Sequence, residues 1–121
     1  MKITRETTTA LTIRNVSDEF IRVGNRKFTD TIALTTRDVI ESWESCPVDE
    51  LDESNFAELL DTRPELVVLG TGRENRFPPR ELVFAFARRG VGLEVMDTRA
   101  AARTFNVLVS EGRRVVAVLY L

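Results

Sequence analysis

The residues best suited to bind a ligand form a polar segment that follows an apolar run, Glu65 to Leu69. The segment is Gly70-Thr71-Gly72-Arg73-Glu74-Asn75-Arg76-Phe77. Glycines let backbone N–H groups approach a ligand, and ligands of α/β proteins favour the carboxyl ends of strands. Arg73 and Arg76 could make bidentate contacts with a phosphate or a carboxylate. The segment therefore predicts either an anion site or a tight turn between a strand and a helix.

A dinucleotide site fits this segment poorly. The third glycine of the dinucleotide fingerprint would fall at Asn75, and the next helix can begin only at Pro78-Pro79. The glycines would then not lead directly into a helix N-terminus, where the pyrophosphate has to sit. We therefore expect no dinucleotide here, and we predict no cofactor of another kind.

A second group of polar residues lies nearer the C-terminus. We expect Thr98, or Asp97 before it, to cap the N-terminus of a helix. Thr104 and Asn106 compete with a helix for backbone hydrogen bonds, so they either fix that helix to neighbouring loops or contact a ligand or partner. The candidate ligand- or partner-binding residues of the whole chain are Gly70, Thr71, Gly72, Arg73, Arg76, Thr98, Arg103, Thr104, Asn106, Glu111 and Arg113.

Side chains that commonly carry catalysis or bind metals are scarce. The chain has no histidine and one cysteine, Cys46, which excludes Ser-His-Asp triads, Cys-His pairs and zinc or iron–sulfur centres made of several cysteines. No basic residue next to Cys46 in sequence lowers its pKa, so we expect an inert thiol. We assign no catalytic and no metal-binding residue. The protein is more consistent with a non-enzyme, although an activity that uses acids such as Asp97 stays open.

The composition is that of one folded domain. The chain has 121 residues, of which 43% are hydrophobic and 30% are charged, so we expect a single domain over residues 1–121. A lone cysteine fits a reducing compartment, and Met1 to Glu6 lack the apolar core of a signal peptide. The longest apolar run, Leu66 to Leu69, is too short to span a bilayer. We therefore expect a cytoplasmic protein that does not insert directly into a membrane.

Charge is divided unevenly along the chain. Residues 37–65 contain ten acids against two arginines, whereas the remaining residues carry a net positive charge made mostly of arginines. The division indicates an interaction surface or only a solvated face. Glu111 is expected to form an ion pair with Arg113 or Arg114. A pI near 5.3, the absence of a Lys/Arg run and the few aromatic residues argue against nucleic-acid binding.

The first third of the chain predicts β structure. Leu11 to Val16 alternate apolar with polar residues, as a half-buried strand must. Phe20 to Val23 and Lys27 to Thr29 follow, joined by the turn residues Gly24-Asn25. Apolar residues from Ile32 to Trp43 continue the β pattern. These strands should be antiparallel, because their connections are too short for crossovers.

The rest of the chain predicts alternating helices and strands. We expect Ser54 to cap a short helix, a helix that starts at Pro78-Pro79 to end at a left-handed Gly90, and Asp97 or Thr98 to cap a third helix that ends at Gly112. The inward side chains expected on the three helices are, in order, Phe56, Leu59 and Leu60; Leu82, Val83, Phe86 and Ala87; and Ala101, Phe105 and Leu108. The strands expected are Glu65–Leu69, which should be buried on both faces, Val91–Met96 and Arg114–Tyr120. The first two of these strands should be parallel and joined by a right-handed crossover.

Several of these motifs together resemble a known family. They are Gly70-Thr71-Gly72, Pro78, Gly90-Val91, Val95-Met96-Asp97-Thr98, Ala100-Ala101, Arg103-Thr104-Phe105-Asn106-Val107-Leu108 and Glu111-Gly112-Arg113. The chain is similar over nearly its whole length to the small domain family whose eukaryotic members include mitochondrial NADH dehydrogenase (complex I) assembly factor 3. The resemblance implies an α/β fold of three layers: a mixed central sheet, helices packed on it and an additional β-rich N-terminal layer. It also implies no established catalytic residue or cofactor.

The residues and the resemblance together favour a non-enzymatic protein of bacterial type, which acts as a protein–protein interaction or assembly-factor-like module. The expected partner is a protein. The sequence specifies neither the identity of that protein nor the oligomeric state. The alternative is a protein that binds a small anionic metabolite at Gly70 to Gly72, with or without an enzymatic activity.

Overall fold

The computed structural model describes residues 11–121. The expectation about Met1 to Glu6 lies outside the described residues. The strands are β1 Ile13–Val16, β2 Ile21–Val23, β3 Arg26–Phe28, β4 Ile32–Leu34, β5 Val39–Ile40, β6 Leu66–Thr71, β7 Gly92–Met96 and β8 Val115–Tyr120. The helices are the short η1 Val48–Glu50, η2 Glu53–Phe56 and α2 Ala57–Leu60, and the longer α3 Arg80–Arg89 and α4 Thr98–Ser110.

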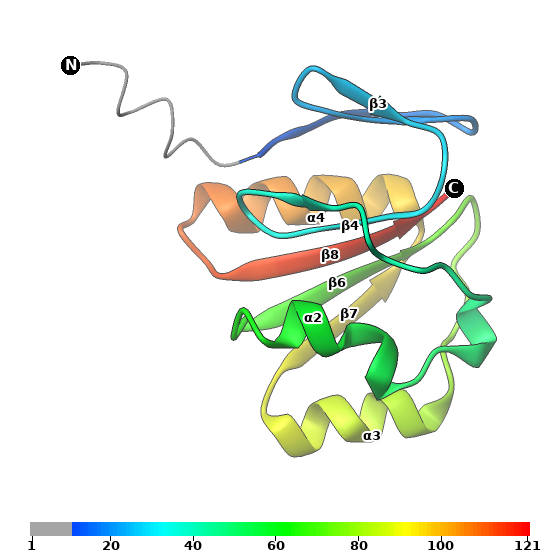
Figure 1. Cartoon of the computed structure of the whole chain (residues 1–121), viewed down its shortest axis with the longest axis vertical. Helices are drawn as coiled ribbons and strands as arrows, with labels where there is room; N and C mark the ends of the chain where they lie inside the picture. Colours follow the sequence, from blue (N-terminus) through cyan, green and yellow to red (C-terminus); the bar gives the residue numbers. More distant parts are fainter. Residues whose placement is uncertain (1–10) are drawn as a thin grey trace.

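The central sheet has five strands in the order β5-β4-β8-β6-β7 (Figure 1). β6 pairs in parallel with both β7 and β8, whereas β4 pairs antiparallel with β5 and β8. The sheet is therefore mixed, as predicted, and the parallel pair β6 and β7 is joined through α3. β6 and β8 are buried along their whole length because both lie inside the sheet and are covered on both faces.

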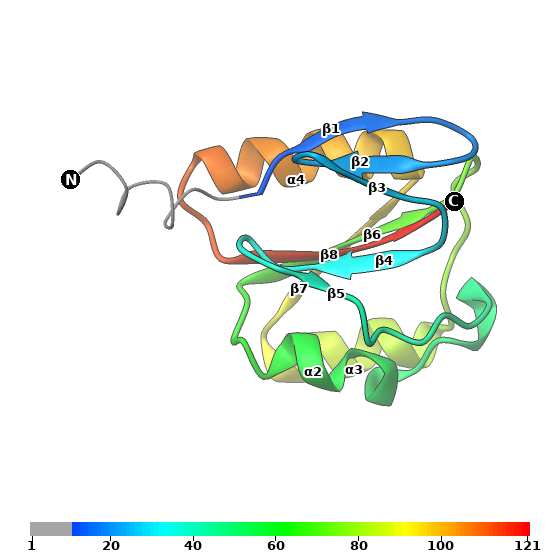
Figure 2. The same cartoon turned by 45° about the horizontal axis from the view of Figure 1, so that its top comes forward.

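Two layers cover the central sheet, one on each face (Figure 2). A three-stranded antiparallel sheet, β1-β2-β3, lies with α4 on one face. The short helices and α3 lie on the other face. Alternate residues of β6 and β8 feed the two apolar cores: Val68 and Ala117 face α4, while Val67 and Val116 face α3. The three-layer fold is confirmed. The predicted β-rich first third divides between the two sheets.

Two details of the helices differ from the sequence prediction. Asp52, rather than Ser54, caps the short η2 helix: its carboxylate accepts from the Ser54 N–H, and the Asn55 side chain accepts from the Asp52 N–H. In α3 the buried stripe is Leu82, Ala85 and Phe86. This stripe keeps the i, i+3, i+4 spacing of one helix face.

The expected stripe of α3 was wrong at two positions. Val83 and Ala87 each follow a core residue directly, and one residue along a helix turns the side chain by about 100°. Both side chains are therefore exposed. The turn at the end of α3 is as expected, because Gly90 has a φ of 71° and closes the helix in the left-handed conformation.

The start of α4 settles which of two adjacent residues is the cap. Asp97 is the N-cap, and its carboxylate accepts from the Ala100 N–H at 3.0 Å. Thr98 is the first residue of the helix and is buried. Of the three side chains expected to face inward, Ala101 and Phe105 are buried, and Leu108 is half-buried against the same core.

Candidate functional site

Strand β6 is longer than its apolar run. Gly70 and Thr71 belong to β6, where they pair with Leu119 and Tyr120 of β8, so the loop begins two residues later than predicted. A Cβ on Gly70 would lie 2.9 Å from the Thr98 Cα atom and the Ala101 Cβ atom. Gly70 is thus required by the close approach of α4 to the sheet, and its backbone does not face a ligand site.

Thr98 joins the loop to the sheet. Its hydroxyl donates to the Tyr120 carbonyl at 2.6 Å and accepts from the Gly72 N–H at 2.8 Å. Its own N–H donates to the Gly72 carbonyl at 2.8 Å. Gly72 has a φ of 103°, a conformation that favours glycine. The N–H of Gly72, which sequence reasoning offered to an anion, is therefore already used inside the protein.

Thr71 holds the next turn of the loop. Its hydroxyl donates to the Glu74 carbonyl at 2.7 Å and accepts from the Arg76 N–H at 2.9 Å. The buried threonine thus closes residues 71–76 into a compact turn. The arginine side chains of this turn project from a fixed backbone, which is what a preorganised site needs.

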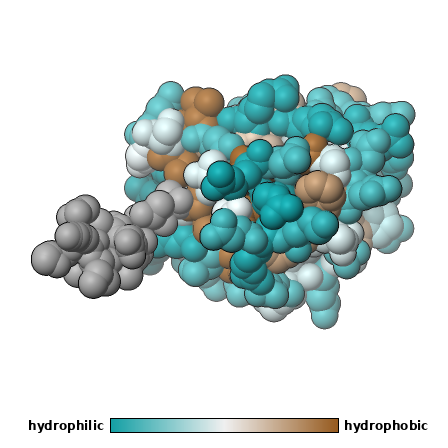
Figure 3. Space-filling view, turned by 90° about the horizontal axis from the view of Figure 1, so that it is seen from above, coloured by the Kyte–Doolittle hydropathy of each residue, from teal (hydrophilic) through white to brown (hydrophobic). Residues whose placement is uncertain are grey.

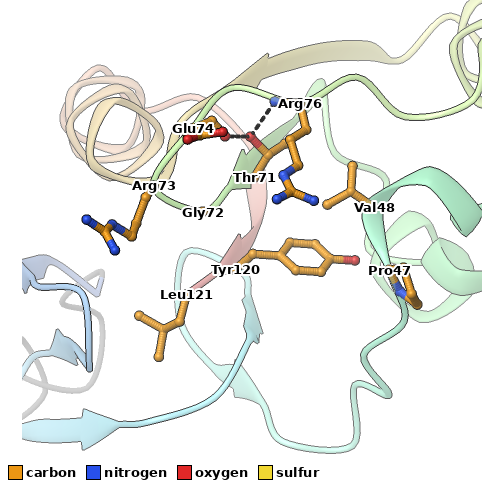
Figure 4. A pocket seen from close by; sticks show the side chains of 9 residues that line it. All are labelled: Pro47, Val48, Thr71, Gly72, Arg73, Glu74, Arg76, Tyr120 and Leu121. Atoms are coloured by element: carbon orange, nitrogen blue, oxygen red, sulfur yellow. Dashed lines mark hydrogen bonds between the residues drawn. The ribbon is translucent and has the colours of Figure 1, made fainter.

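An open cleft of about 590 Å³ lies beside this turn (Figure 4). Its lining residues are Pro47, Val48, Thr71, Gly72, Arg73, Glu74, Arg76, Tyr120 and Leu121. In Figure 4 the Arg76 guanidinium lies between Val48 and the Tyr120 ring, whereas Arg73 points to the other side of Gly72. The Arg73 Nε atom is 3.5 Å from the Asp18 carboxylate. Arg76 is therefore the cation that faces the cleft.

Four lining residues of the cleft lie outside the polar segment predicted from the sequence and were missed: Pro47, Val48, Tyr120 and Leu121. Tyr120 carried the one available signal, because its polar hydroxyl ends an apolar strand. That hydroxyl donates to the Cys46 carbonyl at 2.6 Å and ties β8 to the segment before η1. Pro47 and Val48 lie far from β8 in sequence, and no local pattern links them to it.

The Tyr120 hydroxyl of the cleft wall and the nearby Cys46 thiol keep their protons at neutral pH. Burial raises the pKa of the Tyr120 hydroxyl, and the neighbouring Cys46 raises it further. Burial also raises the pKa of the Cys46 thiol, with Glu50, Asp52 and Asp49 adding negative charge nearby. Since a thiolate is the reactive form of cysteine, Cys46 is a poor nucleophile. The expectation of an inert thiol agrees with this environment.

Arg103, Thr104 and Asn106 lie elsewhere, on α4. Asn106 uses its whole amide on β1: its Oδ1 atom accepts from the Ile13 N–H at 2.9 Å and its Nδ2 atom donates to the Ile13 carbonyl at 2.8 Å. The Thr104 hydroxyl is 3.4 Å from the Met96 sulfur. Arg103 is exposed beside a small groove between α4 and β1. These residues do not reach the cleft.

Glu111 and Arg113 lie at the opposite end of the sheet from the cleft. The predicted ion pair between Glu111 and Arg113 or Arg114 was wrong, because both arginines pair with Glu65, the residue just before β6. The Arg113 hydrogen bond lowers the pKa of Glu65. The fold brings Gly70, Thr71, Gly72, Arg73, Arg76 and Thr98 together and leaves the other candidates in two separate places. Within residues 11–121, no group of three or more Cys, Asp or Glu side chains is arranged to hold a metal ion.

Comparison with known families decides the relationship of this chain. The model of a family described as a protein of unknown function (DUF498/DUF598) matches residues 13–120. The chain belongs to this family. Among solved structures, the crystal structure of a protein from Bordetella parapertussis superposes with a TM-score of 0.85 at 35% identity, over 93% of this chain and 97% of that one. The likeness extends over both sheets and the helices.

Two relatives of known name are similar to this DUF498/DUF598 chain. NADH dehydrogenase (ubiquinone) 1 alpha subcomplex assembly factor 3 of Bos taurus is 38% identical over 113 residues. The match covers 90% of this chain but only 60% of the assembly factor's length. The 13 kDa major membrane protein of Francisella tularensis is 27% identical over 94 residues, which cover 77% of this chain and 76% of that protein. The resemblance to the assembly-factor family is confirmed. In residues 11–121, no helix has the length and apolar character needed to cross a membrane.

Proposed function

We propose that the protein is a non-enzymatic, assembly-factor-like module that binds a protein partner, and that subunits of NADH dehydrogenase are such partners. The observation that carries the proposal is the 38% identity to the bovine assembly factor over 90% of this chain. Because the aligned part is 60% of that factor, the role is proposed for the shared domain. We also propose that the module works in the cytoplasm, where its single thiol would stay reduced.

The α3 side of the molecule supports a contact surface. Phe77, just before the helix, is 77% exposed, and Phe84 and Val83 on the helix are 53% and 44% exposed. Large aromatic side chains are enriched at the centre of protein interfaces, where their burial stabilises the complex. Their positions on one helix and on the segment leading into it make this side the proposed docking surface.

Affinity capture from the native host, followed by mass spectrometry, tests the proposal. We expect the wild-type protein to retain subunits of NADH dehydrogenase and a Phe77→Ser/Phe84→Ser variant to lose most of them. A Val107→Ser variant is the matched control, because the Val107 side chain is 54% exposed, close to the 53% of Phe84, but lies on α4. Equal retention by all three proteins would contradict the α3 surface. Failure of the wild type to retain any such subunit would contradict the proposed role.

The cleft supports a second candidate function, the binding of a small anionic metabolite. Among residues 11–121, Arg76 forms no ion pair, and its guanidinium faces the cleft. A guanidinium offers a bidentate fork to carboxylate or phosphate. Glu74 lies on the same wall, so the site suits an anion that contacts Arg76 directly rather than one held by a broad positive field.

A thermal-shift screen with carboxylated and phosphorylated metabolites tests the cleft. A ligand at 100 times its dissociation constant should stabilise the protein by about 2.7 kcal/mol. The Arg76→Gln variant should lose this stabilisation, whereas Arg88→Gln, an exposed arginine on α3, should keep it. An equal shift in both variants, or no shift with any metabolite at saturation, would exclude the cleft as an anion site.

A further inference from the structure

A groove of about 210 Å³ lies between β1 and α4, on the side of the central sheet opposite α3. Figure 2 shows β1 running alongside α4, and Figure 3 shows that this side of the molecule is largely hydrophilic. The lining residues are Ile13, Arg14, Asn15, Val16, Arg99, Ala102, Arg103 and Asn106. Three of them are arginines and none is acidic.

The three arginines come together from two elements. Arg99 and Arg103 stand four residues apart on α4, where like charges repel each other, and Arg14 enters from β1. The Arg99 guanidinium already has two partners within the protein. Its Nη1 atom donates to the Val16 carbonyl at 2.8 Å, and its Nη2 atom is 3.6 Å from the Asp18 carboxylate. Within residues 11–121, Arg14 and Arg103 form no ion pair.

The backbone beneath these side chains is fixed. Asn106 holds Ile13 by two hydrogen bonds, and Arg99 holds Val16, so both ends of β1 are tied to α4. The two walls of the groove therefore keep a set separation. Asn15 also lines the groove, and its side chain carries an amide donor. A group bound here would meet donors on both sides without a rearrangement of the backbone, which lowers the cost of binding.

We propose that this groove binds a phosphate group, carried by a small phosphorylated compound or by an anionic lipid headgroup. The arginine forks match the oxygens of a phosphate bidentately. A groove of about 210 Å³ has room for a phosphate group. An anion would also relieve the repulsion among the three guanidinium groups. This site is separate from the α3 surface and from the Arg76 cleft, and it does not depend on either.

Isothermal titration calorimetry with inorganic pyrophosphate tests the groove. The wild type should bind with an affinity that falls as salt rises, because the contacts are charged and exposed. The Arg14→Gln/Arg103→Gln variant should bind at least tenfold more weakly, whereas Arg76→Gln and Arg88→Gln should bind as the wild type does. An Arg103→Lys variant should fall between, because it keeps the charge and loses the planar fork. Circular dichroism of each variant establishes that it is folded.

A vesicle arm distinguishes the two sources of phosphate. Sedimentation with phosphatidylcholine vesicles, with and without phosphatidylglycerol, should show binding only to the anionic vesicles if the source is a lipid headgroup. The same arginine pair should be required. Binding of pyrophosphate alone would assign the site to a soluble compound. Equal affinity of the double variant and the wild type, or no binding of either probe, would overturn the proposal.

Discussion

The two faces of the central sheet are held by different kinds of interaction. On the α3 face, aromatic side chains pack against each other: the Phe56 ring lies 5.5 Å from Trp43 and 5.3 Å from Phe86, both in edge-to-face geometry. On the α4 face, polar side chains make long-range hydrogen bonds, in which Thr98 holds Tyr120 and Asn106 holds Ile13. Apolar packing is continuous and non-directional, whereas these bonds fix particular backbone atoms.

This difference indicates which face is suited to position groups for binding. On the α3 face a core of packed rings supplies stability. The exposed side chains of α3, such as Phe84, are therefore available to contact a partner. A face held by directional bonds keeps the loop at Gly72 and the edge of β1 in place, and the candidate anion sites lie beside those two elements.

The largest effect should come from the aromatic core. Phe56→Ala removes a fully buried ring and leaves a cavity between Trp43 and Phe86. We expect the free energy of unfolding to fall by about 3–5 kcal/mol in urea denaturation. The control is Phe84→Ala on the exposed side of α3, which should change stability by no more than about 0.5 kcal/mol. Similar losses in the two variants would mean that the aromatic cluster does not stabilise this face.

The next largest effect should come from the buried threonine on the other face. Thr98→Val keeps the shape but removes the hydroxyl, which leaves the Gly72 N–H and the Tyr120 carbonyl without that partner. We expect a loss of about 2–3 kcal/mol, because buried polar groups that lose a partner are costly. Thr104→Val is the matched control, since its hydroxyl contacts only a sulfur. Equal stability of the two variants would refute the role given to Thr98.

The contrast between the faces also explains what the sequence could predict. Patterns that depend on neighbouring residues were reliable: the parallel unit of β6, α3 and β7, the left-handed Gly90, and the buried Phe56, Leu59 and Leu60 all follow from local spacing and turn chemistry. An alternative stayed open where two adjacent residues could both cap one helix. Asp97 and Thr98 can both cap a helix, and only the packing of α4 on Gly70 decides between them.

The candidate site was less predictable, because its contacts join distant parts of the chain. The Gly72 turn was found from its glycines and arginines, but Tyr120 and Val48 reach the same cleft from other elements. Arg113 was expected to pair with its neighbour Glu111, whereas β6 brings Glu65 alongside it. Asn106 and Ile13 are 93 positions apart, and no local pattern encodes that pair.

A smaller effect is expected from the clamp on β1. Asn106→Ala removes both hydrogen bonds to Ile13 and should lower stability by about 1–2 kcal/mol. Because β1 is an edge strand, the loss should be local, so amide hydrogen exchange should accelerate at Ile13 while Val68 in the central sheet stays protected. The exposed Asn75→Ala serves as the control. Unchanged exchange at Ile13 would show that α4 does not hold this strand through Asn106.

The smallest effect tests the one directional bond that reaches the aromatic face. Tyr120, whose side chain packs with that core, donates to the Cys46 carbonyl, and burial raises the pKa of its hydroxyl. The folded state therefore holds this proton more tightly than the unfolded state, in which tyrosine titrates near pH ~10. The contribution of the Tyr120 hydroxyl to the free energy of unfolding should be fully present below that pH, and it should be lost as the pH rises above it. Urea denaturation at pH 8 and pH 11 measures the slope. In a Cys46→Ser background, which removes the thiol that titrates in the same range, Tyr120→Phe should flatten the slope. An unchanged slope would mean that the unfolding equilibrium at high pH is governed by other groups, and that the Tyr120 hydroxyl does not link β8 to the cleft wall.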